Sequence, residues 1–231
     1  MAENLVIEHR FRGPPASGNG GYTCGIVAAL VGDPAEVTLR SPPPLDRPLD
    51  VLREDGRVLL LDGETLVAEA RPAELDLEVP APPSYEEAEE ASRGYPGFFE
   101  HAFPECFVCG PARAPGDGLR IFGGPAGDRV AAPWRPDAWL AGADGRVRPE
   151  FVWSVLDCPG AFAVNALERG EALLGRLAAT VVARPRPGER CVVIGWQLAP
   201  HEGRKRFAGT AVYAEDAGLC GYGRAVWITS A

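Results

Sequence analysis

Two stretches of this sequence are apolar on almost every helical face, and short segments of alternating polar and apolar residues surround each of them. The first stretch follows Asn19 and continues to Val31, and the second covers residues 151–167. A helix that is apolar all round is buried, because no side of it suits water. The pattern therefore predicts two buried helices, each enclosed by strands.

Alternation and turn residues predict strands on both sides of the first helix. Residues 5–11 precede the helix, and residues 35–40, 50–54, 57–62 and 64–70 follow it. Asp55-Gly56 and Asp62-Gly63 separate the last three segments, and such pairs favour tight hairpins. The first half therefore predicts one strand, a buried helix and a run of antiparallel strands.

The second half repeats this order. Its predicted strands are residues 118–122 and 129–134 before the helix and residues 176–183, 191–199, 207–213 and 219–229 after it. Proline-rich loops occupy matching places, residues 40–48 in one half and 183–190 in the other. Such self-similarity indicates duplication. We predict an α+β fold of two curved antiparallel sheets, each wrapped around a buried central helix, whose edges could pair.

Residues 78–104 divide the two halves, since their sequence is rich in proline and glutamate. We interpret residues 1–77 and 105–231 as two structural units and residues 78–104 as their linker.

The composition and net charge of the chain exclude some classes of partner. The chain has 231 residues, of which 46% are hydrophobic, and a net charge of -9. Nucleic-acid binding needs a basic surface, so we expect no nucleic-acid partner. The first residues do not resemble a signal peptide, and no apolar run is long enough for a membrane span, so we expect a cytoplasmic protein without a membrane partner. The six scattered cysteines are expected to be reduced.

One carboxylate, Asp157, lies in the middle of the second apolar stretch. Pro159 follows it and cannot donate to the carbonyl of Val155, so the helix should be kinked there. Burial raises the pKa of a carboxyl group, which makes Asp157 a candidate base or nucleophile. The alternative is an aspartate that caps a helix or faces a wet surface.

The first helix opens with Asn19-Gly20-Gly21. Asparagine is a favoured N-cap, and glycine in a first turn lowers helix propensity by about 1 kcal/mol each. Free N–H groups without a Cβ beside them form a site for an anionic oxygen. The alternative is a glycine-rich turn that allows the helix to pack tightly on a sheet.

The order of elements and the two helix sequences resemble the hotdog-fold acyl-CoA thioesterases, especially the phenylacetyl-CoA type. In that family a His/Asn-Gly-Gly motif opens the central helix, and an acid lies nine positions after its first residue. Asn19-Gly20-Gly21 matches the opening, but its acid position is Ala28. Arg148-Pro149-Glu150 fails the opening, but its acid position is Asp157. The segment Cys106-Phe107-Val108-Cys109-Gly110 also resembles one found before the first strand in many of these proteins.

The resemblance implies a tandem double hotdog with one composite site, in which Asn19, Gly20 and Gly21 face Asp157. It further implies that the N–H groups of Gly20 and Gly21 stabilise the oxyanion of an acyl thioester. Asp157 would activate water or attack directly. The second, equivalent position should be inactive. The expected partner is an acyl-CoA or another acyl thioester; the resemblance implies no cofactor and allows a homodimer of double hotdogs.

Candidate substrate contacts come from rings and charges near these elements. Tyr22, Phe151 and Trp153 lie on or beside the helices and could line an acyl pocket, or they could be core. Three arginines in the second proline-rich loop could bind the CoA phosphates, or they could be a solvated face: Arg184, Arg186 and Arg190.

The histidines and cysteines of the sequence allow other classes of site. A hotdog hydratase would need a histidine paired with an acid, and His9, His101 and His201 all lie away from the helix starts. Cys106 and Cys109 could form half a zinc site, but the remaining cysteines form no second pair, so we expect no metal. A binding or scaffold protein that has lost turnover stays open.

Overall fold

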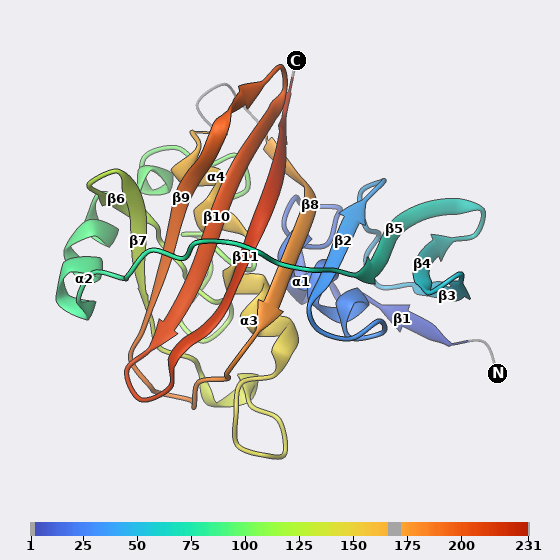
Figure 1. Cartoon of the computed structure of the whole chain (residues 1–231), viewed down its shortest axis with the longest axis horizontal. Helices are drawn as coiled ribbons and strands as arrows, with labels where there is room; N and C mark the ends of the chain where they lie inside the picture. The colour runs from blue at the N-terminus through green and yellow to red at the C-terminus, as the bar shows by residue number, and fades with distance from the viewer. Residues whose placement is uncertain (1–2, 166–171, 231) are drawn as a thin grey trace.

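A continuous antiparallel sheet joins the two halves of the chain in the computed structural model, which describes residues 3–165 and 172–230. Within those residues its strand order is β1-β3-β4-β5-β2-β8-β11-β10-β9-β7-β6 (Figure 1). The first half supplies β1 (Asn4–Val6), β2 (Ala35–Leu39), β3 (Pro48–Glu54), β4 (Arg57–Asp62) and β5 (Thr65–Pro72). The second half supplies β6 (Gly124–Ala126), β7 (Arg129–Trp134), β8 (Ala172–Val181), β9 (Cys191–Glu202), β10 (Lys205–Ala214) and β11 (Gly218–Thr229).

The two halves meet where β2 pairs with β8. Their register runs from Ala35 opposite Ala179 to Thr38 opposite Arg176. An unpaired strand edge leaves backbone N–H and C=O groups without partners, and this pairing removes one such edge from each half. The prediction of two distinct sheets is therefore wrong, whereas the edge-to-edge pairing considered with it is found.

The central helices lie behind the sheet in Figure 1. The first is α1 (Gly20–Ala28), which packs against α3 (Pro149–Val155). The predicted second helix is two helices, since α4 (Cys158–Ala163) begins after a break at Asp157. The proline after Asp157 removes a donor at this point, as the sequence predicted. Helix α4 ends before residues 166–171, so the predicted end at Leu167 lies outside the described residues.

The predicted linker is an ordered part of the fold. It contains α2 (Tyr85–Arg93), which packs against β6 and β7. Ser84 and Glu87 form a capping box at its start. The chain before α2 crosses the face of the sheet opposite the central helices (Figure 1), and Tyr213 donates to the Pro80 carbonyl there. The segment between the halves therefore contains a helix that is packed on the sheet.

Two predicted strands differ from the structure. Residues 118–122 form no strand, because Leu119 and Ile121 donate their backbone N–H groups to the carbonyls of Phe107 and Val108 in a long loop. The predicted strand over residues 5–11 is shortened to β1 and followed by a 3-10 helix, His9–Phe11. Two other 3-10 helices are Pro96–Phe98 and Ala138–Leu140. In the described part of the chain, no helix is long and apolar enough to span a membrane.

Candidate active site

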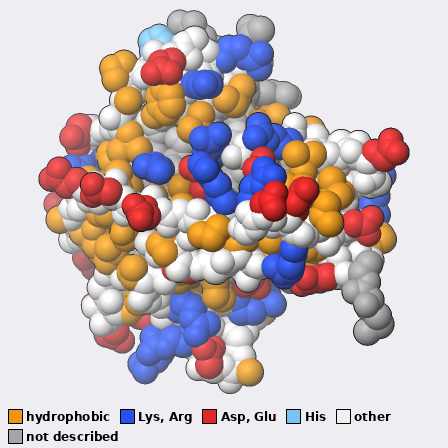
Figure 2. Space-filling view, turned by 45° about the vertical axis from the view of Figure 1, so that its right-hand side comes forward, with side chains coloured by type: hydrophobic (Ala, Val, Ile, Leu, Met, Phe, Trp, Pro, Cys, Tyr) orange, Lys and Arg blue, Asp and Glu red, His pale blue; other side chains and the backbone are white. Residues whose placement is uncertain are grey.

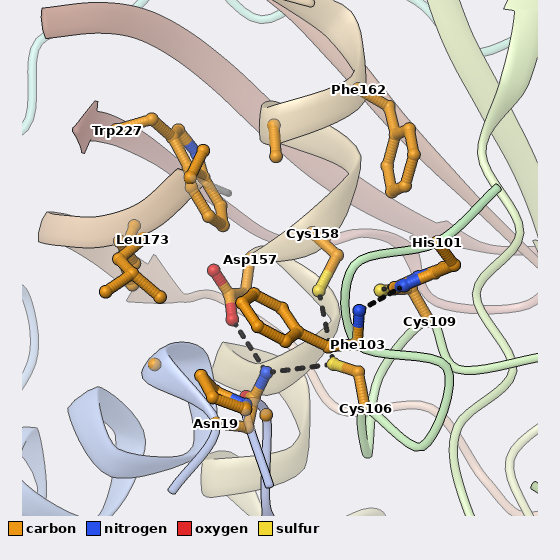
Figure 3. A pocket seen from close by; sticks show the side chains of 16 residues that line it. Asn19, His101, Phe103, Cys106, Cys109, Asp157, Cys158, Phe162, Leu173 and Trp227 are labelled. Atoms are coloured by element: carbon orange, nitrogen blue, oxygen red, sulfur yellow. Dashed lines mark hydrogen bonds between the residues drawn. The ribbon is translucent and has the colours of Figure 1, made fainter. Parts of the chain in front are cut away.

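Asp157 lies at the break between α3 and α4, and its carboxylate points to the start of α1. The residue is 1% exposed. Its Oδ2 accepts a hydrogen bond of 2.9 Å from Asn19 Nδ2 and another of 2.9 Å from the Gly21 N–H. The structure therefore brings together Asn19, Gly21 and Asp157 from opposite halves of the chain. Figure 3 shows the side chains of Asn19 and Asp157 pointing toward each other.

Asn19 has two tasks at this point. Its side-chain oxygen accepts from the Tyr22 N–H at 2.9 Å, which confirms it as the N-cap of α1. Its amide nitrogen is thereby turned toward Asp157. One residue both starts the helix and orients the acid.

The two glycines allow this close approach. A Cβ on Gly21 would lie 2.5 Å from the Cβ of Asp157, and one on Gly20 would lie 2.9 Å from the side chain of Leu174. A larger residue at position 21 would push α1 away from the acid, and one at position 20 would push it away from Leu174. The close contact agrees with the interpretation that the glycines allow tight packing, although the neighbour of Gly21 is the α3–α4 break rather than a sheet.

The two N–H groups have different partners. That of Gly21 donates to Asp157, so the expectation that it binds the thioester carbonyl is corrected. The N–H of Gly20 is the first of the helix and has no intrahelical partner. Among the described residues, no acceptor takes its hydrogen. Gly20 remains the donor available to a ligand.

The other oxygen of Asp157 is buried without a hydrogen-bond partner in the described chain. Figure 3 shows this oxygen, Oδ1, directed toward the space beside Leu173 and Trp227. The pKa of this carboxyl group is raised to about 7, and burial is the largest cause. The hydrogen bond from the Gly21 N–H acts in the opposite direction and lowers the pKa. An acceptor of this kind inside a cavity can take a proton from a neighbouring molecule.

A cavity of about 60 Å³ opens at this oxygen. Asn19, Gly20 and Asp157 line it together with residues from several separate segments, among them His101, Phe103, Cys158, Leu174 and Trp227. The indole N–H of Trp227 is also buried without a partner in the described chain. Sequence reasoning missed this set of residues, because they come from segments that are far apart in the chain and none of them carries a motif of its own.

A larger groove of about 520 Å³ adjoins the cavity. The two spaces share Pro14, Gly20, Phe103, Leu173 and Leu174. Apolar residues, chiefly prolines and leucines, make up most of the groove wall, and Arg40 is its basic residue. The groove offers an apolar path from the surface to Asp157.

The aromatic residues predicted to contact substrate lie in the core. Tyr22 and Phe151 belong to one cluster of rings with Phe11, where Phe11 and Tyr22 stack at 4.0 Å between ring centroids. Trp153 is 3% exposed. None of the three predicted residues lines the cavity or the groove. For these rings the alternative interpretation, that they are core, is the correct one.

The arginines predicted to bind CoA are also away from both spaces. Arg184 pairs with Asp144, and Arg190 pairs with Glu86 and covers the ring of Tyr85. On the face that Figure 2 shows, Lys and Arg side chains lie among acidic and apolar ones rather than in one large basic area. Arg186 has no acidic partner among the described ion pairs. The placement of these three arginines favours a structural or solvated role over binding of CoA.

Cysteines form part of the cavity wall. Cys106, Cys109 and Cys158 line it, and Asn19 Nδ2 lies 3.6 Å from Cys106 Sγ. All six cysteines of the chain are free thiols. Cys106 Sγ lies 3.8 Å from Cys158 Sγ, and the neighbouring thiols of Cys109 and Cys158 hold the pKa of Cys106 well below its usual range. Sequence reasoning considered only a second cysteine pair, whereas the structure places a single third cysteine, Cys158, beside Cys106 and Cys109.

Comparison with known proteins gives the fold. The sequence matches no protein-family model and no curated protein. A candidate thioesterase II from Thermobifida fusca has a TM-score of 0.61 and 12% identity, over 99% of this chain and 92% of its own. A candidate thioesterase from Novosphingobium aromaticivorans has a TM-score of 0.60 and 13% identity, over 99% and 95%.

A third solved structure is a conserved protein of unknown function with a hotdog fold from Alicyclobacillus acidocaldarius. It has a TM-score of 0.56 and 11% identity, over 99% of this chain and 92% of its own. The chain therefore has the hotdog fold. At such low identity the likeness concerns the fold alone, and function must be argued from the site.

Proposed function

We propose that the chain hydrolyses an acyl thioester, such as an acyl-CoA, at the site formed by Asn19, Gly20, Gly21 and Asp157. The observation that carries this proposal is the unpartnered Oδ1 of Asp157, buried at a cavity beside the free N–H of Gly20. A base and an oxyanion donor side by side are the two groups that acyl transfer to water requires. The structural likeness to candidate thioesterases agrees with this chemistry.

In this mechanism, Asn19 and Gly21 hold one carboxylate oxygen and leave the other free. Oδ1 takes a proton from water as the water oxygen attacks the thioester carbonyl. The N–H of Gly20, at the positive end of α1, stabilises the oxyanion that forms. The tetrahedral intermediate then expels the thiolate, which receives the proton, and the products are a carboxylic acid and a free thiol. Direct attack by Oδ1 is the other route, through an anhydride that water then opens.

The groove supplies the place for the rest of the substrate. Its wall of leucine and proline side chains suits an apolar acyl chain or the slender arm of a carrier, and Arg40 can meet a phosphate near the surface. We take residues 1–77 and 105–231 as two hotdog units, so that the helix start and the acid come from different units. The equivalent pairing of Arg148-Pro149-Glu150 with Ala28 would lack both the donor and the acid.

The test is release of free thiol from a panel of acyl-CoAs, from acetyl to medium-chain and aryl groups. The proposal expects turnover, with apolar acyl groups ahead of acetyl. A non-hydrolysable acyl-CoA analogue is titrated in parallel. Binding of the analogue with no turnover of any thioester would indicate a binding protein and contradict the proposal.

A further inference from the structure

Three cysteine sulfurs that are distant in sequence converge on one point of the cavity wall. Cys106 and Cys109 come from the long loop before β6, and Cys158 is the first residue of α4. All three are buried, and their sulfur atoms lie within 4.8 Å of one another. Figure 3 shows Cys106 and Cys158 pointing toward each other, with Cys109 and His101 beside them.

The spacing of these sulfurs is that of metal ligands. A tetrahedral zinc ion with Zn–S bonds of about 2.3 Å places its sulfurs about 3.8 Å apart. Cys106 Sγ lies 3.8 Å from Cys158 Sγ. The other two sulfur pairs are within 4.8 Å. One ion can therefore contact all three sulfurs after a shift of about 1 Å or less in each of the longer sulfur–sulfur separations.

The turn that carries the first two sulfurs is preorganised. The Gly110 N–H donates to the Cys106 carbonyl at 2.9 Å, and a Cβ on Gly110 would lie 2.5 Å from the Cys106 nitrogen. The protein itself therefore holds the Cys106–Cys109 turn in place before any ion is bound.

His101 supports the cluster from outside. Its Nδ1 accepts from the Phe103 N–H at 2.9 Å, so the ring proton resides on Nε2. That nitrogen lies 3.3 Å from Cys109 Sγ and donates to it. Asn19 likewise directs its amide at Cys106. Donors to ligand sulfurs are typical outer partners of a metal site.

We propose that Cys106, Cys109 and Cys158 together bind one thiophilic divalent cation of the zinc class. Three sulfurs fill three tetrahedral positions, and the fourth ligand is a water or small molecule from the cavity. Sequence reasoning rejected a metal because it sought a second local cysteine pair, whereas the third ligand comes from the other side of the fold.

The ion would fasten the loop to α4. Residues 99–123 contain no helix or strand, and a segment of that length inside a compact domain needs other restraints. The loop supplies His101 and Phe103 to the cavity, and α4 begins next to Asp157. Binding should therefore raise the thermal stability of the protein, because the folded chain alone presents the complete site.

The experiment uses the full chain, reduced and freed of metal by a chelator, and titrates it with Co²⁺ and Zn²⁺ as probes. We expect one equivalent of Co²⁺ per chain, a sulfur-to-cobalt charge-transfer band, displacement of that band by Zn²⁺, and a higher Tm with either ion. Cys158→Ser and Cys109→Ser should lose stoichiometric binding and the rise in Tm. His101→Ala should keep the band and weaken binding by about 10- to 100-fold, as loss of an outer partner does.

Cys191→Ser and Cys220→Ser are matched controls, since both residues are buried cysteines outside the cluster. They should bind Co²⁺ as wild type does, and circular dichroism checks that every variant is folded. Failure of the reduced wild-type chain to bind one equivalent would overturn the proposal. So would unchanged binding in folded Cys158→Ser, or an equal loss in the control variants.

Discussion

Asn19 and Asp157 are 138 positions apart in the chain, and their side chains meet through a hydrogen bond of 2.9 Å. The same asparagine caps α1, so the position of the helix and the orientation of the acid are fixed together. A serine at position 19 can still cap the helix but cannot reach the carboxylate.

Asn19→Ser and Asn19→Ala separate the two tasks of this residue. Both variants lose the amide, so both should lose most thioester hydrolysis. Only alanine also loses the cap, which should lower its free energy of unfolding by about 1 kcal/mol relative to serine. Urea unfolding and thiol release measure the two effects, and full hydrolysis by Asn19→Ser would show that the amide does not position the acid.

The raised pKa of Asp157 predicts how stability depends on pH. Its pKa is about 7 in the fold against an ordinary 3.8, so the fold favours the protonated form. This favourable effect is complete below the unfolded pKa and is lost as the pH rises through 7. Asp157→Asn cannot titrate. Relative to wild type, it should therefore gain stability between pH 4 and 8, by at most about 4 kcal/mol for some three pKa units.

Thermal unfolding with chelator and reductant present measures this difference at the two pH values. Asp128→Asn is the control, because Arg129 lowers the pKa of the exposed Asp128 carboxyl group and the sign of its effect is opposite. A Tm difference between Asp157→Asn and wild type that stays constant with pH would contradict the raised pKa.

Gly21 is predicted to tolerate no side chain. The Cβ of Gly21→Ala would lie 2.5 Å from the Cβ of Asp157, so α1 and the α3–α4 break must separate. Overpacking of this kind costs about 1–3 kcal/mol. Gly142→Ala serves as the control, since the nearest atom to its Cβ is a side-chain oxygen of Asp144 at 3.4 Å. Equal stability of the two variants in urea unfolding would argue against the close contact.

Arg40 and Arg57 form a matched pair for the groove. Both donate to Glu69 at 3.1 Å, but only Arg40 lines the groove. Arg40→Ala should raise the KM for acyl-CoA and leave that for an acyl-N-acetylcysteamine, which has no phosphates, unchanged. Arg57→Ala should alter neither. If Arg190→Ala weakened acyl-CoA use instead, the sequence-based assignment of the CoA site would be the better one.

Local signals predicted the parts of the fold that depend on neighbours in sequence. The strand over residues 57–62 has the bounds of β4, and the N-cap at Asn19 and the irregularity beside Pro159 are as expected. The spacing of Ser84 and Glu87 is that of a capping box, which is a signal for the start of a helix. The prolines and glutamates around it favoured a linker, so no helix was predicted there. The predicted meeting of the Asn19 turn with Asp157 also occurs in the structure.

Sequence patterns did not predict most contacts between residues that are distant in the chain. Apolar periodicity shows that Tyr22 and Phe151 are buried, but it does not distinguish core from cavity wall. Polar and apolar residues at positions 118–122 follow a pattern typical of a strand. Their backbone nevertheless donates to Phe107 and Val108, in the loop that carries Cys106 and Cys109, and not to a strand of the sheet. Cys158 joins Cys106 only because the break before α4 faces that loop.

The most direct measurement of the central claim is the kcat of Asp157→Asn on the best acyl-CoA of the panel. Asparagine keeps the shape of the side chain and removes both the base and the nucleophile, so kcat should fall by about 10²- to 10⁴-fold. Glu150→Gln, at the equivalent helix start of the other half, is the control and should turn over like wild type. Folding is checked by circular dichroism and by binding of the non-hydrolysable analogue. A folded Asp157→Asn variant with the kcat of wild type would contradict the account.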